Sequence, residues 1–211
     1  MKLAQLAEGL NYTLVQGSLE EEITNVRYDT RAITGGEVFV CICGYSRDSH
    51  DMAAQAVEQG AKALLIQHDL EQLPEGVAVL KVEDTKLGLA LMSANFFGHP
   101  AEKMTMIGVT GTKGKTTTAH MIRSVLTAAG RKVGMVGTTG VEYPGFFAEL
   151  PNTTPQSYEL QKYFRDMVDA GCDTLVMEVS SQGLMNQRVA GIHYQIGVFT
   201  NLYLDHVGGP G

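Results

Sequence analysis

Residues 108–117 read Gly-Val-Thr-Gly-Thr-Lys-Gly-Lys-Thr-Thr. An apolar run over 104–109 leads into this stretch, and a predicted helix over 117–129 follows it. A strand, a glycine-rich turn and a helix N-terminus in this order allow backbone N–H groups to converge on phosphate oxygens. The stretch therefore predicts phosphate binding, with Lys115 as the charge on the β- and γ-phosphates and the Thr116 hydroxyl as a Mg²⁺ ligand.

One position departs from the strict phosphate-loop pattern. The pattern asks for a glycine five residues before Gly114, where this chain has Val109, and the glycines stand at Gly108 and Gly111 instead. The alternative interpretation is a strand-to-helix turn that binds nothing. The strand–loop–helix context and the Gly-Lys-Thr-Thr run favour the phosphate site.

Polar side chains also end two other predicted strands. Glu178 closes the strand expected over 174–179, and Asp205 and His206 follow the one expected over 196–202. Ligands of parallel sheets bind at the carboxyl ends of the strands, so we expect these groups to face the phosphate loop. Glu178 would act on Mg²⁺ directly or through water, although a strand-end salt bridge is an open alternative.

The run Asn152-Thr153-Thr154-Pro155 carries two kinds of signal. Thr154 and Pro155 are favourable N-cap and first-turn residues, so a helix is expected from there to about residue 170. Capping does not explain Asn152 and Thr153, whose polar groups could bind a ligand. Arg188 is either a bidentate clamp for an anionic group or a solvated charge.

Composition limits the class of protein. The 211 residues are 44% hydrophobic and 18% charged, with a net charge of −7, which argues against nucleic acid as a partner. No apolar run is long enough to cross a membrane, and the first residues are too polar for a signal peptide. Three cysteines fit a reducing cytoplasm. Cys41 and Cys43 are expected to be packed thiols, and no Cys/His spacing suggests zinc.

Strands alternate with helices, which predicts an α/β fold of two domains, 1–98 and 104–211, with a boundary at 99–103. Residues 1–20 are expected to form a short helix and a polar turn. Asp84 is expected to cap a helix whose apolar stripe is Leu87, Leu91 and Ala94. Residues 137–151 are expected to form a long loop. The remaining strands are expected over 23–31, 37–43, 63–67, 77–82 and 132–136, and a further helix over 51–59.

Four ordered motifs resemble the Mur ligases, in particular their MurE branch of UDP-N-acetylmuramoyl-tripeptide synthetases. The motifs are Thr-Gly-Thr-x-Gly-Lys-Thr-Thr at 110–117, Asn-Thr-Thr-Pro at 152–155, Met-Glu-Val-Ser-Ser-x-Gly-Leu at 177–184 with Arg188, and Phe-Thr-Asn-Leu at 199–202 with Asp205 and His206. The loop of that family also lacks the first glycine, which accounts for Val109. Residues 29–31, 36–40, 44, 50–51 and 60–61 resemble the family's uridine-nucleotide domain.

The resemblance implies an ATP- and Mg²⁺-dependent cytoplasmic ligase. ATP would phosphorylate the terminal carboxylate of a UDP-MurNAc-dipeptide, and the amine of a free amino acid of the diaminopimelate or lysine type would attack the acyl phosphate. By resemblance, Gly111, Thr112, Lys113, Gly114, Lys115, Thr116 and Thr117 hold ATP. The catalytic residues would be Lys115, Glu178 and His206, and the Mg²⁺ ligands Thr116, Glu178 and His206. The substrate would contact Tyr28, Thr30, Tyr45, Ser46, Arg47, Asn152, Thr153, Thr154, Ser180, Asn186 and Arg188.

Several departures from the family limit this interpretation. Lys113 stands where Asn is usual, Thr30 where Ser is usual, and Asn186 where Gln is common. Family members continue with a lysine, carbamylated to bridge Mg²⁺, and with a C-terminal amino-acid domain. We therefore expect a monomeric fragment, without a membrane or nucleic-acid partner, that binds its ligands without turnover. The alternatives are a ligase of the MurF or folylpolyglutamate synthetase type, a non-catalytic nucleotide-binding module, and, disfavoured because no Asn-Lys-x-Asp motif occurs, a P-loop GTPase.

Overall fold

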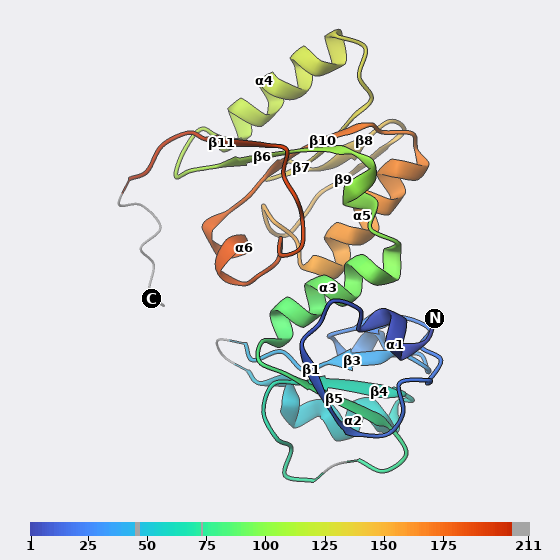
Figure 1. The fold of residues 1–211 in the computed structure, drawn as a ribbon. Helices are drawn as coiled ribbons and strands as arrows, with labels where there is room; N and C mark the ends of the chain where they lie inside the picture. Colours follow the sequence, from blue (N-terminus) through green and yellow to red (C-terminus); the bar gives the residue numbers. More distant parts are fainter. Residues whose placement is uncertain (45–46, 73, 204–211) are drawn as a thin grey trace. The chain divides into compact units, whose positions relative to one another are not determined.

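The structure is a computed structural model that describes residues 1–44, 47–72 and 74–203. The chain forms two compact units, Met1–Gly98 (unit 1) and His99–Gly211 (unit 2), each built on its own sheet (Figure 1). Strands and helices alternate in both units, so the predicted α/β class is confirmed. Among the described residues, no helix has the length and apolar character needed to span a bilayer.

Unit 1 has a five-stranded sheet in the order β1-β5-β4-β3-β2. Strands β2 to β5 run parallel, and β1 pairs antiparallel with β5. The strands are β1 (Tyr12–Gln16), β2 (Val26–Arg27), β3 (Val38–Val40), β4 (Ala63–Ile66) and β5 (Ala78–Val82). The helices are α1 (Leu3–Leu6), α2 (Ala53–Glu58) and α3 (Thr85–Phe97), with single 3₁₀ turns η1 (Thr30–Ala32) and η2 (Ser49–Met52).

Two predictions in unit 1 were only partly correct. Residues 1–20 contain the expected short helix, α1, but they also contain the strand β1 where a turn was predicted. β1 is an edge strand with exposed central residues, so its sequence lacks the alternation of apolar and polar residues that identifies a half-buried strand. Asp84 does cap α3, accepting hydrogen bonds from the N–H groups of Lys86 and Leu87. The predicted stripe on α3 is only partly correct, because Ala94 is buried but Leu87 is 38% exposed. Leu89 and Met92, which the prediction left out, are buried instead.

We expect residues 1–98 to fold without the rest of the chain. The unit has its own core, in which Phe39 and Leu64 of the sheet pack with Ala53 and Ala56 of α2. It also ends at a helix stop, since Gly98 takes the left-handed conformation that closes α3. A dispersed amide NMR spectrum of the isolated 1–98 segment would support this expectation. A collapsed spectrum would show that the boundary is misplaced.

Unit 2 has a six-stranded sheet in the order β11-β6-β10-β7-β8-β9. The first four strands are parallel, and β8 and β9 extend the sheet as antiparallel strands. The strands are β6 (Thr105–Thr110), β7 (Val133–Gly137), β8 (Gly140–Tyr143), β9 (Phe146–Ala148), β10 (Thr174–Glu178) and β11 (Ile196–Phe199). The helical segments are η3 (Pro100–Lys103), α4 (Lys115–Ala128), α5 (Ser157–Asp169) and α6 (Ser181–Met185).

Alternating apolar side chains bury both faces of this sheet, and α4 and α5 lie on opposite sides (Figure 1). Ile107 and Val176 point toward α4, whereas their neighbours Met106 and Leu175 pack on the α5 side. Continuous apolar strands are what a sheet covered on both faces requires. β6, β10 and β7 are parallel neighbours in the sheet, so their carboxyl ends lie side by side. The candidate site is formed at these ends.

The structure corrects two further predictions in unit 2. Residues 137–151 contain the hairpin β8–β9 rather than a long loop, with Tyr143 opposite Phe146 across Pro144 and Gly145. Gly145 has φ +82°, a value that glycine adopts readily at such a turn. Thr154 does not cap α5: the N-cap is Gln156, without a side-chain hydrogen bond.

Candidate functional site

The phosphate-binding loop joins β6 to α4 through two glycines with positive φ, Gly111 at +131° and Gly114 at +84°. Gly114 is the N-cap of α4, and its carbonyl accepts the N–H of Thr118. In such a helix the N–H groups of the first turn, here residues 115–117, have no carbonyl of the same helix to bond. The loop therefore presents oriented donors and the positive end of the helix dipole at one point.

The segment that follows β11 braces this loop. The side-chain amide of Asn201 accepts the N–H of Lys113 at 3.0 Å and donates to the Lys113 carbonyl at 3.0 Å. Thr200 Oγ1 donates to the same carbonyl at 2.7 Å. The backbone of Lys113 is thus committed to the brace, so its contribution to a ligand would come from its exposed side chain. Sequence reasoning identified Asn201 only as part of a motif and missed this role.

Lys115 folds back over the loop. Its Nζ donates to the carbonyls of Gly111 at 2.8 Å and Thr112 at 3.1 Å. These bonds hold the ammonium group at the loop, and its predicted contact with the β- and γ-phosphates stays a prediction. The charge is therefore in place before a ligand arrives.

Glu178, at the carboxyl end of β10, is fully buried next to the start of α4. Its Oε2 accepts the Thr116 hydroxyl at 2.9 Å, and its Oε1 accepts the Thr138 N–H at 2.9 Å. Thr138, which the sequence analysis missed, follows β7 directly, and the strand-end rule that identified Glu178 would also have found it. Within the described part of the chain, the carboxylate bonds to hydroxyl and amide donors of Thr116 and Thr138 and does not form the strand-end salt bridge.

Thr154 connects the wall of the site to β10. Its hydroxyl donates to the Glu178 carbonyl at 3.0 Å and accepts the Ser180 N–H at 3.0 Å. The Thr154 carbonyl in turn accepts Arg188 Nη1 at 2.8 Å. Arg188 Nε is buried without a hydrogen-bond partner among the described residues, so the guanidinium retains donor capacity. Thr154 is itself 0% exposed and positions its neighbours from below the surface.

These groups surround one open cleft of about 940 Å³. The residues lining it are Thr110, Gly111, Thr112, Lys113, Gly114, Lys115, Thr116, Thr138, Asn152, Thr153, Glu178, Ser180, Ser181, Gln182, Leu184, Arg188, Phe199, Leu202 and Tyr203. Among the predicted residues of unit 2, Thr117, Thr154 and Asn186 do not line it. Asp205 and His206 lie outside the described residues, so their predicted roles stay predictions.

Comparison with known proteins decides the family. Residues 109–209 match the profile described as the Mur ligase middle domain, and residues 22–97 match that of the Mur ligase family catalytic domain. The chain belongs to the Mur ligase family. Among curated relatives, UDP-N-acetylmuramoyl-L-alanyl-D-glutamate–2,6-diaminopimelate ligase of Clostridium perfringens is 44% identical over 207 residues, which are 98% of this chain and 43% of that protein. The ligase of the same name from Bacillus licheniformis is 43% identical over 208 residues, 98% of this chain and 42% of that protein.

Solved structures of Mur ligases show the same fold. A UDP-N-acetylmuramoyl-L-alanyl-D-glutamate–2,6-diaminopimelate ligase superposes with a TM-score of 0.82 at 21% identity, over 100% of this chain and 42% of that one. MurF from Acinetobacter baumannii gives 0.56 at 21% identity, over 85% of this chain and 35% of that one. This Mur ligase chain thus spans less than half the length of the relatives it matches.

The predicted uridine-end residues lie in unit 1 of this Mur ligase. Tyr28 is half-buried, Thr30 is buried in η1, and Arg47 is exposed. Tyr45 and Ser46 lie outside the described residues. A cavity of about 570 Å³ in the same unit is lined instead by residues from the α1–β1 connection and the start of α3, among them Asn11, Asp84 and Leu91. The contacts predicted for the uridine end remain predictions.

Proposed function

We propose that this chain supplies the ATP site and the peptide-substrate site of an amide-forming ligase of peptidoglycan precursor synthesis. The observation that carries the proposal is the single cleft that joins the phosphate loop, the Thr116–Glu178 pair and the wall of Asn152, Thr153, Ser180 and Arg188. The relatives that cover the chain act, by their names, on UDP-N-acetylmuramoyl-L-alanyl-D-glutamate and 2,6-diaminopimelate. These are the substrates we propose for the complete protein.

The residues present fit Mg-ATP. Glu178 and Thr116 offer hard oxygen atoms, the donor type that Mg²⁺ prefers. A Cβ on Gly111 would meet Thr200 Oγ1 at 2.2 Å, so the close packing of the loop on the segment after β11 requires glycine there. Thr116 and Glu178 would hold Mg²⁺, with His206 as a further proposed ligand. The ion would neutralise charge on the phosphates during transfer.

The proposed reaction has two steps. A carboxylate oxygen of the dipeptide attacks the γ-phosphorus of ATP and ADP leaves; the amine nitrogen of the amino acid then attacks the acyl carbon and phosphate leaves. Lys115 and the N–H groups of residues 115–117 would stabilise charge on the transferring phosphoryl group. Arg188 and the hydroxyls of Thr153 and Ser180 would orient the peptide, so the chain acts by positioning rather than as a nucleophile.

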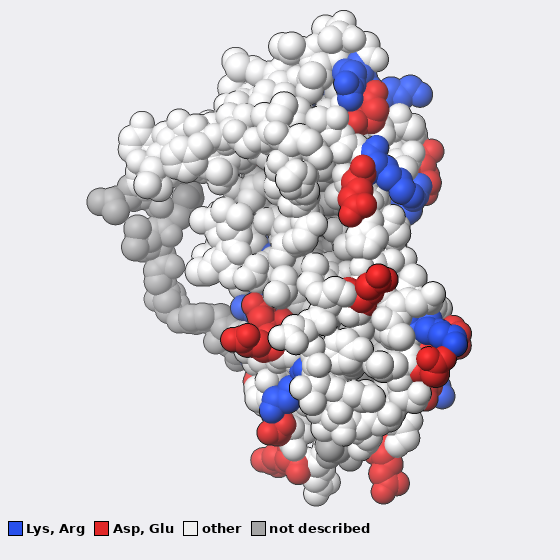
Figure 2. All heavy atoms as spheres, in the orientation of Figure 1, with Lys and Arg blue, Asp and Glu red and all other residues white. Residues whose placement is uncertain are grey.

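The remaining parts of the proposal concern location and partners. Tyr28, Thr30, Tyr45, Ser46 and Arg47 would contact the uridine end. On the face shown in Figure 2, basic side chains of the described residues lie beside acidic ones. The substrate we propose is not a nucleic acid, because the net charge of the chain is −7. We propose a cytoplasmic monomer.

Gly137→Ala is expected to weaken the Mg²⁺ dependence of ATP binding. A Cβ on Gly137 would lie 2.3 Å from Glu178 Oε1, so the carboxylate must leave the Thr138 N–H. Displacing groups that orient a metal ligand costs about 10- to 100-fold in affinity. Titration calorimetry with ATP, with and without Mg²⁺, measures the effect. Gly197→Ala on β11, where a Cβ meets nothing within 4 Å, is the control. If Gly137→Ala keeps the wild-type Mg²⁺ dependence, the role given to Glu178 is wrong.

Substrate choice is tested by calorimetry in the presence of a non-hydrolysable Mg-ATP analogue. We expect UDP-MurNAc-L-Ala-D-Glu to bind, and a folate or the UDP-MurNAc-tripeptide to bind at least about tenfold more weakly. Preference for the tripeptide would indicate a MurF-type ligase, and preference for the folate a folylpolyglutamate synthetase. Binding of the nucleotide alone would favour a nucleotide-binding module.

A further inference from the structure

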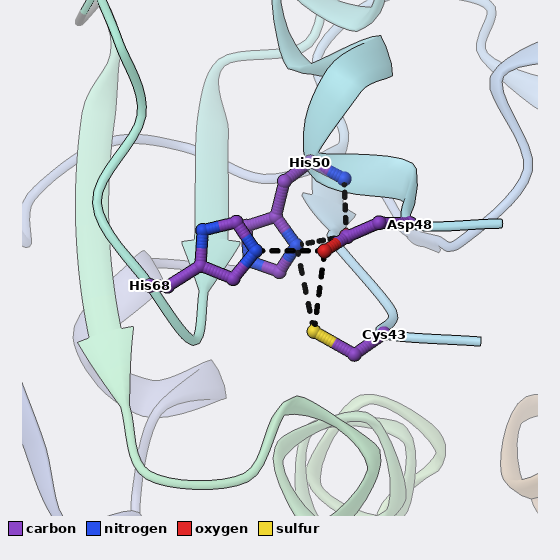
Figure 3. A group of neighbouring side chains, drawn as sticks. All are labelled: Cys43, Asp48, His50 and His68. Atoms are coloured by element: carbon purple, nitrogen blue, oxygen red, sulfur yellow. Dashed lines mark hydrogen bonds and ion pairs between the residues drawn. The ribbon is translucent and has the colours of Figure 1, made fainter. Parts of the chain in front are cut away.

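Four side chains of unit 1, Cys43, Asp48, His50 and His68, gather in one cluster (Figure 3). Each offers one ligand-type atom, and these atoms lie within 4.8 Å of one another. Cys43 and Asp48 face each other as an isolated antiparallel bridge, His50 lies in η2, and His68 follows β4. The four residues are spaced by five, two and eighteen positions, which matches no zinc motif, so a metal site could not be predicted from the sequence.

His50 is held in a tautomer that does not suit a metal ligand. The Gln67 N–H donates to His50 Nε2 at 2.9 Å, so Nε2 carries no proton. Because Nε2 accepts this bond, the ring proton is on Nδ1. Nδ1 lies 2.5 Å from Asp48 Oδ1, so it donates to that oxygen. A cation at Nδ1 would have to remove the last ring proton, which assigns His50 to orienting the carboxylate.

His68 has the arrangement usual for a metal-binding histidine. Its Nδ1 lies 3.2 Å from the Asp69 carbonyl, which can only accept, so Nδ1 carries a proton. Histidine ligands commonly donate their second ring N–H to a carbonyl in this way. Nε2 is thereby presented to the cluster, 2.7 Å from Asp48 Oδ2. The ring stacks on that of His50 with centroids 3.8 Å apart, which holds its orientation.

The third atom is the Cys43 sulfur, 3.6 Å from Asp48 Oδ2. Tetrahedral zinc places a sulfur and an oxygen ligand about 3.5 Å apart, and a nitrogen and an oxygen about 3.3 Å apart. The sulfur–oxygen pair already fits. The His68–Asp48 pair must open by about 0.6 Å for that geometry, and the His68 side chain, 52% exposed, has room to move.

We propose that Cys43 Sγ, Asp48 Oδ2 and His68 Nε2 form a binding site for Zn²⁺, with His50 as the residue that positions Asp48. A thiolate and an imidazole select zinc-like cations over Mg²⁺. Three protein ligands leave a fourth position for water. Binding releases the thiol proton and any proton on His68 Nε2 to solvent, with no change of oxidation state. The cation would connect Cys43 and Asp48 to His68, which follows β4, and so stabilise unit 1.

Co²⁺ is the probe, because a thiolate bound to it gives a charge-transfer absorption that oxygen ligands do not. The band therefore distinguishes Co²⁺ bound at Cys43 from Co²⁺ bound by the oxygen atoms of Thr116 and Glu178. We expect the reduced 211-residue chain to show this band at one Co²⁺ per chain, displaced by Zn²⁺. Cys43→Ser should abolish the band, and His68→Gln should weaken affinity about 10- to 100-fold. Cys172→Ser and the exposed His193→Gln are the matched controls and should behave as wild type.

The role of His50 needs a readout beyond stability. His50→Asn keeps a donor near the position of Nδ1 and should retain more Co²⁺ affinity than His50→Ala, with circular dichroism and thermal melting confirming that both are folded. Equal affinities in two folded variants would remove His50 from the proposal. The site itself is refuted if wild type shows no thiolate band at excess Co²⁺, or if the band survives Cys43→Ser in a folded protein.

Discussion

Gly111→Ala is expected to destabilise the chain by about 3 kcal/mol and to abolish Mg-ATP binding. Two penalties coincide at this position. Gly111 has φ +131°, where side chains are strained, and an added Cβ would lie 2.2 Å from Thr200 Oγ1 and 2.8 Å from the Asn201 carbonyl. The Cβ would therefore push away the segment that braces the loop, and the donors for phosphate would lose their common direction.

Gly114→Ala is the matched control for that experiment. Gly114 also has positive φ, +84°, but a Cβ there meets nothing within 4 Å. Only the backbone strain remains, which costs about 1–2 kcal/mol. Urea denaturation measures both free energies of unfolding, and calorimetry measures ATP affinity. Equal destabilisation by the two substitutions would mean that contact with Thr200 and Asn201 does not determine the loop.

Lys115→Ala is expected to lower Mg-ATP affinity by about 10- to 100-fold, equivalent to about 1.5–3 kcal/mol for a charge-assisted hydrogen bond. The ammonium already lies over the loop, bonded to the Gly111 and Thr112 carbonyls. A phosphate would accept from a donor whose position is fixed in advance, so little ordering entropy opposes the bond. Isothermal titration with Mg-ATP measures the loss.

Lys162→Ala removes the same charge from an exposed position on α5, which covers the opposite face of the sheet from α4. Its ATP affinity should equal that of wild type, and both variants should unfold in urea as cooperatively as the parent chain. Unchanged affinity in Lys115→Ala would show that Lys115 is not a phosphate ligand.

The fold could be predicted where local signals agree with tertiary structure. Buried parallel strands such as β6 and β10 appear as short apolar runs, and Asp84 is a cap whose partners are three residues away at most. The face of α3 could not be predicted, because this helix is apolar on several sides and tertiary contacts decide which side is buried. The hairpin β8–β9 was missed because its exposed aromatic residues suggested a loop.

The sequence also predicts part of how the candidate site residues are grouped. Lys115, Thr116 and Glu178 follow from a motif and from strand ends, and the structure brings Thr116 and Glu178 within 2.9 Å. The interaction partners of Thr154 and Asn201 could not be inferred, because they depend on which loops meet in space. The Cys43 cluster is another case of this kind, since its members are close only once β4 and η2 are packed.

The central claim is that one cleft binds both Mg-ATP and the UDP-MurNAc dipeptide, and amide NMR of the isotopically labelled chain tests it most directly. Mg-ATP should shift the amide signals of residues 111–117 and of Thr138. UDP-MurNAc-L-Ala-D-Glu, added next, should shift those of Asn152, Thr153 and Ser180, and the Nε signal of Arg188. Absence of shifts at saturating ligand, or shifts confined to residues that do not line the cleft, would contradict the account.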